Sequence, residues 1–448
     1  MAEHRIQTPW AVVLLAATSA LLAWQMFAFI SEHGVNILFW DLWDIYPVLF
    51  SESSWWEIVR VRSGVHRQGP GFLLTKLVAD ATSMNTRAES FAIAGVFCGA
   101  LAAAIGLARA VIGKFRYTDS ILPLIVLTSV QQDTWVGVPN LSVGAAPLLL
   151  ILLLCVAWII PGNGLQACAV IGVNLMLVNS GYGLVAAPLA PGLFAVGLFH
   201  AVHQGDSRRA AWAGAGLAGS LGAIALLLYG WSPGFNSACA AAGSADQMML
   251  PGFVVLMLAK FVGLDFDHFG LFSTVFGTVL FFAMLEVLVR RGKRVLRHED
   301  RNPTADRVVF TLVGFSMLYA FLTAYGRICE SLLVSQSSRY MTLLIPGFVG
   351  LYLDLLTRPA FRWRRAALGI FLAAALFGSV SVWLVTDDGA ARIRDSKLRW
   401  KECYLRVEDV GRCDAEARAQ VYPWDPAVNL PPRLEYLKEN RLNLYSER

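Results

Sequence analysis

Long apolar runs constrain this chain more than any other feature of its sequence. About eleven of them follow one another between residues 10 and 385, and their middles carry few ionisable side chains. Hydrophobic residues make up 56% of the chain and charged residues only 15%, compared with roughly 25% charged in soluble domains. A soluble core cannot hide that much apolar surface. The sequence therefore predicts an all-α integral membrane protein with about eleven transmembrane helices.

The apolar runs differ in length, and the shorter ones predict an irregular fold. The runs cover residues 10–30, 88–112, 118–132, 141–160, 165–181, 184–201, 210–230, 268–289, 308–326, 340–357 and 366–385. Runs 118–132, 165–181 and 184–201 are shorter than the roughly 20 residues that a straight crossing needs. We expect broken or re-entrant helices there, which membranes tolerate where they line a cavity. The stretch 251–263 is expected at the outer interface, because charged residues follow it.

The basic residues between the runs predict one orientation. If the N-terminus is cytoplasmic, every strongly basic loop falls on the inner side, as the positive-inside rule requires. These loops carry Lys114 and Arg116, then Arg208 and Arg209, then the run from Arg290 to Arg307, and finally Arg358, Arg362, Arg364 and Arg365. The basic runs are short and flanked by apolar segments, so they indicate a lipid bilayer and no nucleic acid.

The predicted topology divides the chain into four parts. They are a first span (1–30), an outer loop with interfacial helices (31–87), a transmembrane bundle (88–385) and a small outer C-terminal tail (386–448). No internal repeat or low-complexity linker separates them. Both substantial polar parts are therefore expected on the same, outer face.

The outer loop combines carboxylates, aromatic rings and cations. Asp41 and Asp44 are three residues apart and would share one face of a helix. His66 and Arg67 follow further on. A carboxylate can deprotonate a hydroxyl, and His and Arg can hold a phosphate leaving group, so this set suggests sugar transfer from a lipid-linked phosphate. Aspartates among tryptophans are also ordinary at a membrane surface, and that alternative stays open.

Five short motifs occur in order along the chain. They are WDLWD at 40–44, VHRQGPG at 65–71, QQDTWVGVPN at 131–140, NSGYGLVAAP at 179–188 and SSRYMTLLIP at 337–346. As an ordered set they resemble the GT-C superfamily of membrane glycosyltransferases, in particular a poorly characterised bacterial group. The resemblance implies that a sugar moves from a polyprenyl-phosphate donor to a cell-envelope glycan or lipid acceptor. It also implies the bacterial inner membrane, with a cytoplasmic N-terminus and a periplasmic C-terminus.

The resemblance further implies roles for individual residues. In the family an acidic residue just after the first span is catalytic, and both Asp41 and Asp44 fit that description. By their chemistry and their predicted places at the outer face, His66, Arg67, Arg327 and Arg339 are the expected phosphate-binding residues, and Gln131, Gln132, Asp133 and Tyr340 are expected to line the same cavity. Arginines at the ends of spans also fit anchors that reach the lipid headgroups, so this second interpretation stays open.

Two other classes of function remain as alternatives. A transporter or flippase of a lipid-linked saccharide would need a polar path through the middle of the membrane. A non-catalytic membrane subunit of a polysaccharide assembly system is the other alternative. A glycosyltransferase instead needs Asp41 or Asp44 to meet the cationic residues across one outward cavity. The sequence identifies no cofactor and carries no metal-binding signature, and a divalent cation stays an open possibility.

Cys403 and Cys413 are expected to form a disulfide. They are the two cysteines of the tail, and the predicted topology puts the tail in an oxidising compartment. Gly411 helps the chain to turn back between them. Because the tail has few large apolar residues, we expect it to pack on the outer loop as well. It is either a cap over the mouth of the site or a passive, disulfide-pinned end.

Overall fold

The computed structural model describes residues 9–50, 53–64, 66–230, 248–297, 302–358, 362–385, 387–422 and 426–446. Within these ranges nearly all regular structure is helical. The exception is an antiparallel hairpin of two short strands, β1 (Arg62–Ser63) and β2 (His66–Arg67). The predicted all-α class is confirmed.

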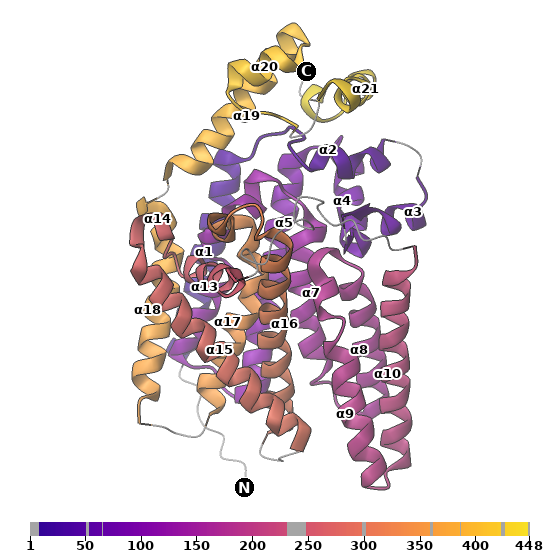
Figure 1. The fold of residues 1–448 in the computed structure, drawn as a ribbon, viewed down its shortest axis with the longest axis vertical. Coiled ribbons are helices and arrows are strands. Elements are labelled where there is room, and N and C mark those ends of the chain that lie inside the picture. Colours follow the sequence, from indigo (N-terminus) through magenta and orange to yellow (C-terminus); the bar gives the residue numbers. More distant parts are fainter. Residues whose placement is uncertain are drawn as a thin grey trace.

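Eight helical segments in the described residues are long and apolar enough to cross a membrane. They are α1 (Pro9–His33), α5 (Thr86–Ile112), η6 with α9 (Gly181–His203), α10 (Ser207–Leu228), α15 (Leu271–Arg297), α16 (Pro303–Arg327), η8 through α17 (Ser338–Thr357), and Arg364–Ser381 within α18 (Arg364–Val385). The long helices run side by side in one bundle (Figure 1). The chain is therefore a multi-pass membrane protein.

Shorter helices complete the bundle. The predicted short run 118–132 is indeed broken: its segment contains η2 (Tyr117–Ser120), α6 (Ile121–Val126) and η3 (Ser129–Gln131). Run 165–181 instead falls mostly in one continuous helix, and run 184–201 belongs to Gly181–His203, which is long enough to cross, so a broken helix was wrong for the first and a run too short to cross was wrong for the second. The shorter apolar helices are η5 (Leu141–Ala145) with α7 (Ala146–Ala157), α8 (Asn163–Val178) and α13 (Leu250–Phe261). At 12 residues, α13 is too short for a straight crossing, and most of its side chains are buried. A total of about eleven spans requires some of these shorter segments to cross as well, and it stays a prediction.

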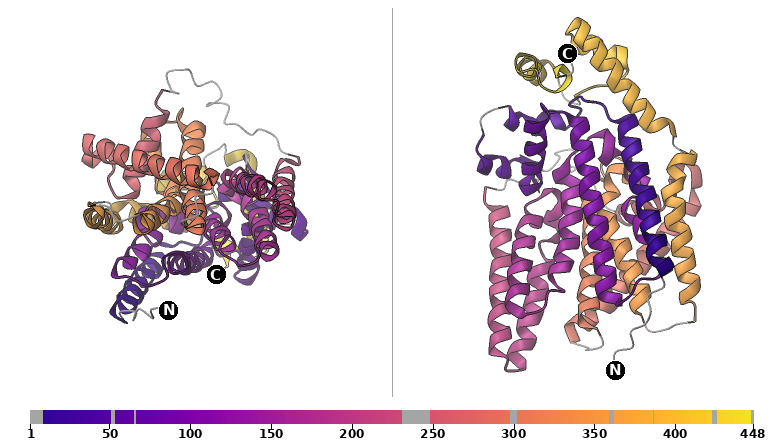
Figure 2. Two further views of the ribbon diagram at one scale, coloured as in Figure 1. Left: turned by 90° about the horizontal axis from the view of Figure 1, so that it is seen from below. Right: turned by 180° about the vertical axis from the view of Figure 1, so that it is seen from behind.

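The outer loop and the tail lie at the same end of the bundle, which we call the tail end. Figure 1 shows the tail helices above the loop helices, and Figure 2 shows the same arrangement from behind, with the start of α1 at the opposite end. The loop contains α2 (Leu42–Ile45), η1 (Tyr46–Leu49), α3 (Trp55–Arg60) and α4 (Gly69–Ala81), and the tail contains α19 (Asp387–Val407), α20 (Val410–Ala417), α21 (Pro426–Glu439) and η10 (Asn443–Tyr445). The remaining elements are η4 (Asp133–Gly137), α14 (Phe266–Phe269), η7 (Leu332–Gln336) and η9 (Thr342–Leu344).

The tail and the outer loop share one hydrophobic core, separate from the core of the bundle. Trp43 and Phe72 of the loop belong to this cluster, together with Trp400 and Leu437 of the tail. Cys403 and Cys413, both fully buried, are joined by a disulfide in the same core. The predicted disulfide is therefore confirmed. The expectation that the tail packs on the outer loop is also correct.

Candidate functional site

One large cavity opens at the tail end of the bundle. Its volume is about 1250 Å³. The walls come from the outer loop, the segments around η4, η5 and η6, the end of α13 with the turn around α14, the segment from within α16 to η9, and the tail. The charged and histidine side chains that line it are Asp41, His66, Asp133, Lys260, Asp265, Asp267, His268, Arg327, Glu330, Arg339, Arg392 and Arg418.

The two candidate aspartates have different surroundings. Asp41 lines the cavity and is exposed, and among the described residues no side chain pairs with its carboxylate. Asp44 is absent from the described lining. Its Oδ1 accepts a hydrogen bond from the Tyr422 hydroxyl (2.8 Å) and lies 3.4 Å from Nη1 of Arg433. Asp44 is therefore attached to the tail, and Asp41 is the carboxylate that faces open space.

The one-turn helix α2 explains this separation. Leu42, Trp43 and Ile45 are at most 4% exposed and anchor α2 in the shared core of loop and tail. The two aspartates occupy the polar side of the same turn, as their spacing predicts. Because the tail covers only the part of that side that carries Asp44, the two carboxylates are left in different environments.

The strand β2 separates His66 from Arg67. Successive residues of a strand point to opposite sides. His66 accordingly lines the cavity, with its ring 4.8 Å from that of Tyr182. Arg67 is 2% exposed, donates to the Tyr229 carbonyl (2.6 Å) and is not among the described lining residues. Burial, together with the nearby Arg327 charge, lowers the pKa of His66 to about 4, so its imidazole is neutral at pH 7.

Close backbone packing brings two of the sequence motifs together. Gly69, in the VHRQGPG motif, has a φ of +60°, and a Cβ there would lie 1.7 Å from the Asn179 carbonyl oxygen of the NSGYG segment. Only glycine permits this approach. The contact places His66 against Tyr182, so residues far apart in the sequence form one wall of the cavity.

The arginine wall lies at the junction of α16 and η8. Arg327, the last residue of α16, lines the cavity and pairs with Glu330. Arg339 also lines it, with its guanidinium 5.1 Å from the Tyr340 ring centre and its Nη2 3.2 Å from the Tyr340 hydroxyl. Two guanidinium groups in one cavity suit the binding of an anion such as a phosphate.

The motif around residue 131 contributes one acidic side chain. Asp133 lines the cavity. Burial raises the pKa of its carboxyl, and the positive charges of Arg339 and Lys397 partly offset that rise. Gln131 is fully buried, where its side chain donates to the Val126 carbonyl and accepts from Thr342. Gln131 and Gln132 are not among the described lining residues, whereas Asp133 and Tyr340 are.

Four further residues at or near the cavity, Lys260, Asp265, His268 and Lys397, are outside the set of site residues predicted from the sequence. Lys260 lies 3.8 Å from Asp265, whose Oδ1 is 2.6 Å from Nδ1 of His268. Lys397 is buried behind the wall, and its ammonium donates to the Val136 and Gly137 carbonyls. Burial lowers the pKa of Lys397 to about 7, and Asp133 opposes the shift.

The burial of Lys397 could have been predicted from the sequence. Lys397 follows Ile393 by four residues and precedes Trp400 by three, so it falls on the apolar face of its own helix. A lysine in that position predicts a buried ammonium with specific partners. The turn around Asp265 offered no comparable signal, because an acidic turn beside an apolar helix is common in solvent.

Comparison with known proteins gives no match. No protein-family model matches the chain, and no curated protein or solved structure matches it significantly. Function is therefore inferred from the cavity and its residues. Within that cavity an unpaired carboxylate, a neutral histidine and two arginines are available, which suits deprotonation of a hydroxyl near a bound anion.

Proposed function

We propose that the protein is a GT-C-type glycosyltransferase that moves a sugar from a polyprenyl-phosphate donor to a cell-envelope glycan or lipid acceptor. One observation carries the proposal: Asp41 shares a single cavity with Arg327 and Arg339. At about 1250 Å³ the cavity exceeds the roughly 300–1,000 Å³ common for small ligands, which leaves room for a donor head and an acceptor together.

Each residue has a defined part in the proposed reaction. Asp41 takes the proton of the acceptor hydroxyl, whose oxygen forms a bond to the anomeric carbon of the sugar. The bond between that carbon and the phosphate oxygen breaks, and the phosphate leaves with the electron pair. Arg327 and Arg339 stabilise the charge that develops on the phosphate. His66, neutral at pH 7, donates or accepts one hydrogen bond within the cavity.

The proposal includes an orientation in the bacterial inner membrane. The tail end would face the periplasm, and the basic loops at the other end would face the cytoplasm. Glu439→Cys, exposed in the tail, and Gln204→Cys, exposed between α9 and α10, form a matched pair for labelling. An impermeant thiol reagent applied to spheroplasts should label the first only. Labelling of the second alone would reverse the orientation.

Analysis of envelope glycans in a strain that lacks the protein tests the function. We expect one sugar to be missing, with restoration by the wild-type chain and no restoration by Asp41→Asn. Full restoration by Asp41→Asn would reject the proposed chemistry. Accumulation of a complete lipid-linked saccharide at the inner face would favour the flippase alternative.

A further inference from the structure

The tail holds the backbone immediately before Asp41. The Trp40 backbone N–H donates to the Val421 carbonyl (2.8 Å), and its indole Nε1 donates to the Gln420 carbonyl (3.1 Å). Trp40 has a φ of 53°, in the left-handed region that a bulky residue rarely adopts. Such a conformation persists only where surrounding contacts impose it. Two tail carbonyls therefore hold Trp40 in a conformation that the free loop would leave.

The tail also fixes the backbone on both sides of Asp41. Before it, the Leu38 N–H donates to Oδ1 of Asn443 (3.0 Å). After it, the Arg433 guanidinium donates to the Trp43 carbonyl. The loop residues from 38 to 43 are thus attached to the tail at points on either side of Asp41.

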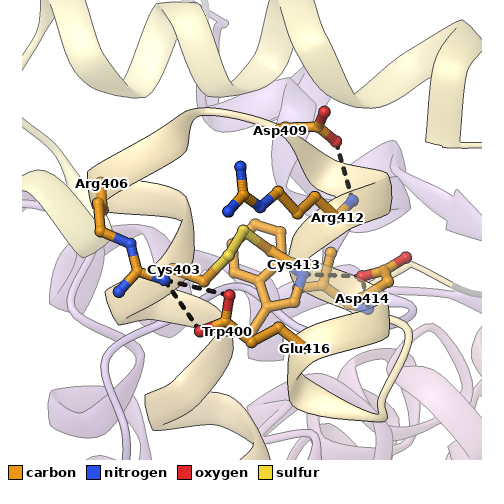
Figure 3. Close-up of a disulfide and its surroundings, with 9 residues drawn as sticks. Trp400, Cys403, Arg406, Asp409, Arg412, Cys413, Asp414 and Glu416 are labelled. Carbon is orange, nitrogen blue, oxygen red and sulfur yellow. Dashed lines mark hydrogen bonds and ion pairs between the residues drawn. A yellow bond between two sulfur atoms is a disulfide. The ribbon is translucent and has the colours of Figure 1, made fainter.

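The attachment point in the tail is itself fixed beside the disulfide. Asp414 follows Cys413, and its Oδ1 accepts hydrogen bonds from the indole of Trp400 (2.7 Å) and from the Val421 N–H (3.2 Å). Figure 3 shows Asp414 next to the disulfide, directed at Trp400. The Cys403–Cys413 bond joins α19 to α20 at this place. A continuous series of contacts therefore runs from the disulfide through residue 421 to Trp40.

We propose that the tail is a positioning clamp for Asp41, and that the Cys403–Cys413 disulfide and Asp414 keep the clamp closed. Trp40 and Asp414 are positioning residues in this account, because they act through the backbone of the loop. The effect on sugar transfer rests on the function proposed above, whereas the effect on the placement of residue 41 does not. Opening the clamp lowers the rate of transfer and leaves donor binding in place, since Arg327 and Arg339 are carried by another part of the chain.

A passive tail predicts a different outcome. Arg418 and Gln420 line the cavity, so the tail forms part of its wall, and a passive end would affect only stability. A clamp changes kcat instead, because a misplacement of about 1 Å can cost roughly 100-fold in rate. For a loosened clamp we expect kcat to fall about 10–100-fold, with the donor KM changed by less than about twofold.

The test has a readout that does not depend on the reaction. Asp41→Cys is labelled with an impermeant methanethiosulfonate reagent, and the labelled position is identified by peptide mass spectrometry. The rate is compared with that in the same protein carrying Cys403→Ser and Cys413→Ser, or carrying Asp414→Ala. Arg406→Ala is the control, because Arg406 pairs with Glu416 on the exposed side of the same helix pair. Transfer kinetics are measured in the same tail variants with Asp41 intact.

We expect a several-fold change in the labelling rate and the fall in kcat in both tail variants, and neither change in Arg406→Ala. Reversible reduction of the folded protein by a phosphine, followed by its removal, is compared with the same treatment of the Cys403→Ser, Cys413→Ser protein, because Cys329 is disulfide-bonded as well and would also be reduced. Unchanged labelling after reduction and in Asp414→Ala would overturn the clamp. A changed labelling rate in a protein whose wild type transfers no sugar would support the clamp and reject the proposed function.

Discussion

The two ends of the bundle use charged residues in opposite ways. At the end away from the tail, Arg291 is 1% exposed and pairs with Asp306 (2.5 Å) and with Asp354 (2.6 Å). Arg290 adds a second contact to Asp354 (2.6 Å). At the tail end, Asp41, Arg327 and Arg339 instead face a cavity of about 1250 Å³.

This difference distinguishes charges that hold helices together from charges that line a cavity. Arg291 lies on α15, Asp306 on α16 and Asp354 on α17, so their ion pairs hold three helices together. Buried charges that satisfy one another have little left to offer a substrate. Charges around an open cavity can bind a ligand of opposite sign, and a carboxylate with no partner can accept a proton from it.

The largest loss of stability is expected at the end away from the tail, where the buried ion pairs of Arg291 lie. Arg291→Met leaves the buried Asp306 carboxylate without its short ion pair and removes one of the two arginines that contact Asp354, and breaking a buried ion pair commonly costs about 3–5 kcal/mol. The free energy of unfolding in mixed detergent micelles measures it. Arg294→Gln is the milder control, because Arg294 is 25% exposed and 3.7 Å from Asp306. The transfer activity of Arg291→Met per folded molecule should be unchanged. A loss of activity beyond the loss of folded protein would contradict the purely structural role of Arg291.

The arginine wall should behave in the opposite way. We expect Arg327→Gln combined with Arg339→Gln to lower the transfer rate about 10²–10³-fold, because the leaving phosphate loses the donors that stabilise it. Arg67→Gln is the matched control, since Arg67 bonds to the Tyr229 carbonyl away from the cavity. Its activity should fall only with the amount of folded protein. Equal losses of transfer rate in both variants would contradict the conclusion that Arg327 and Arg339 act in the cavity and Arg67 does not.

Acidification should destabilise the tail end through His66. Its pKa is about 4 in the folded chain and about 6.5 in the unfolded chain, so between these values the unfolded chain binds more protons. Stability is therefore full above pH 6.5 and falls by about 3 kcal/mol as the pH drops to 4. His66→Asn should remove this component from unfolding curves, while His203→Asn, exposed at the other end, should retain it. An unchanged pH profile in His66→Asn would exclude His66 as its source.

The smallest expected effect concerns the stability of the tail. Loss of the disulfide in Cys403→Ser with Cys413→Ser should cost about 2–3 kcal/mol of local stability, because the unfolded tail gains conformations. Hydrogen exchange of α20 should quicken, while exchange in α16 should not. Cys98→Ser, at a free cysteine of α5, is the control. Two free thiols in protein purified from its native membrane would contradict the disulfide and weaken the periplasmic assignment of the tail.

Local patterns in the sequence predicted the helices well and the side-chain directions poorly. Apolar run length gives the helices of the bundle because it depends on nearby residues, and the disulfide could be predicted because its two cysteines are the pair in the tail and are ten residues apart. Asp44 and Arg67 match their motifs yet lie away from the cavity, owing to Tyr422 and Tyr229. Tyr422 is 378 residues from Asp44 in the sequence, and Tyr229 is 162 residues from Arg67. No local sequence pattern predicts contacts over such separations.

The most direct test of the proposed chemistry compares Asp41→Asn with Asp44→Asn in purified protein supplied with a polyprenyl-phosphate sugar. We expect Asp41→Asn to lower the transfer rate about 10²–10⁴-fold, because the base is lost. Asp44→Asn should stay within about tenfold of the wild type, since an asparagine oxygen still accepts the bond from Tyr422. A wild-type rate in Asp41→Asn, or a larger loss in Asp44→Asn, would contradict the assignment of Asp41 as the base.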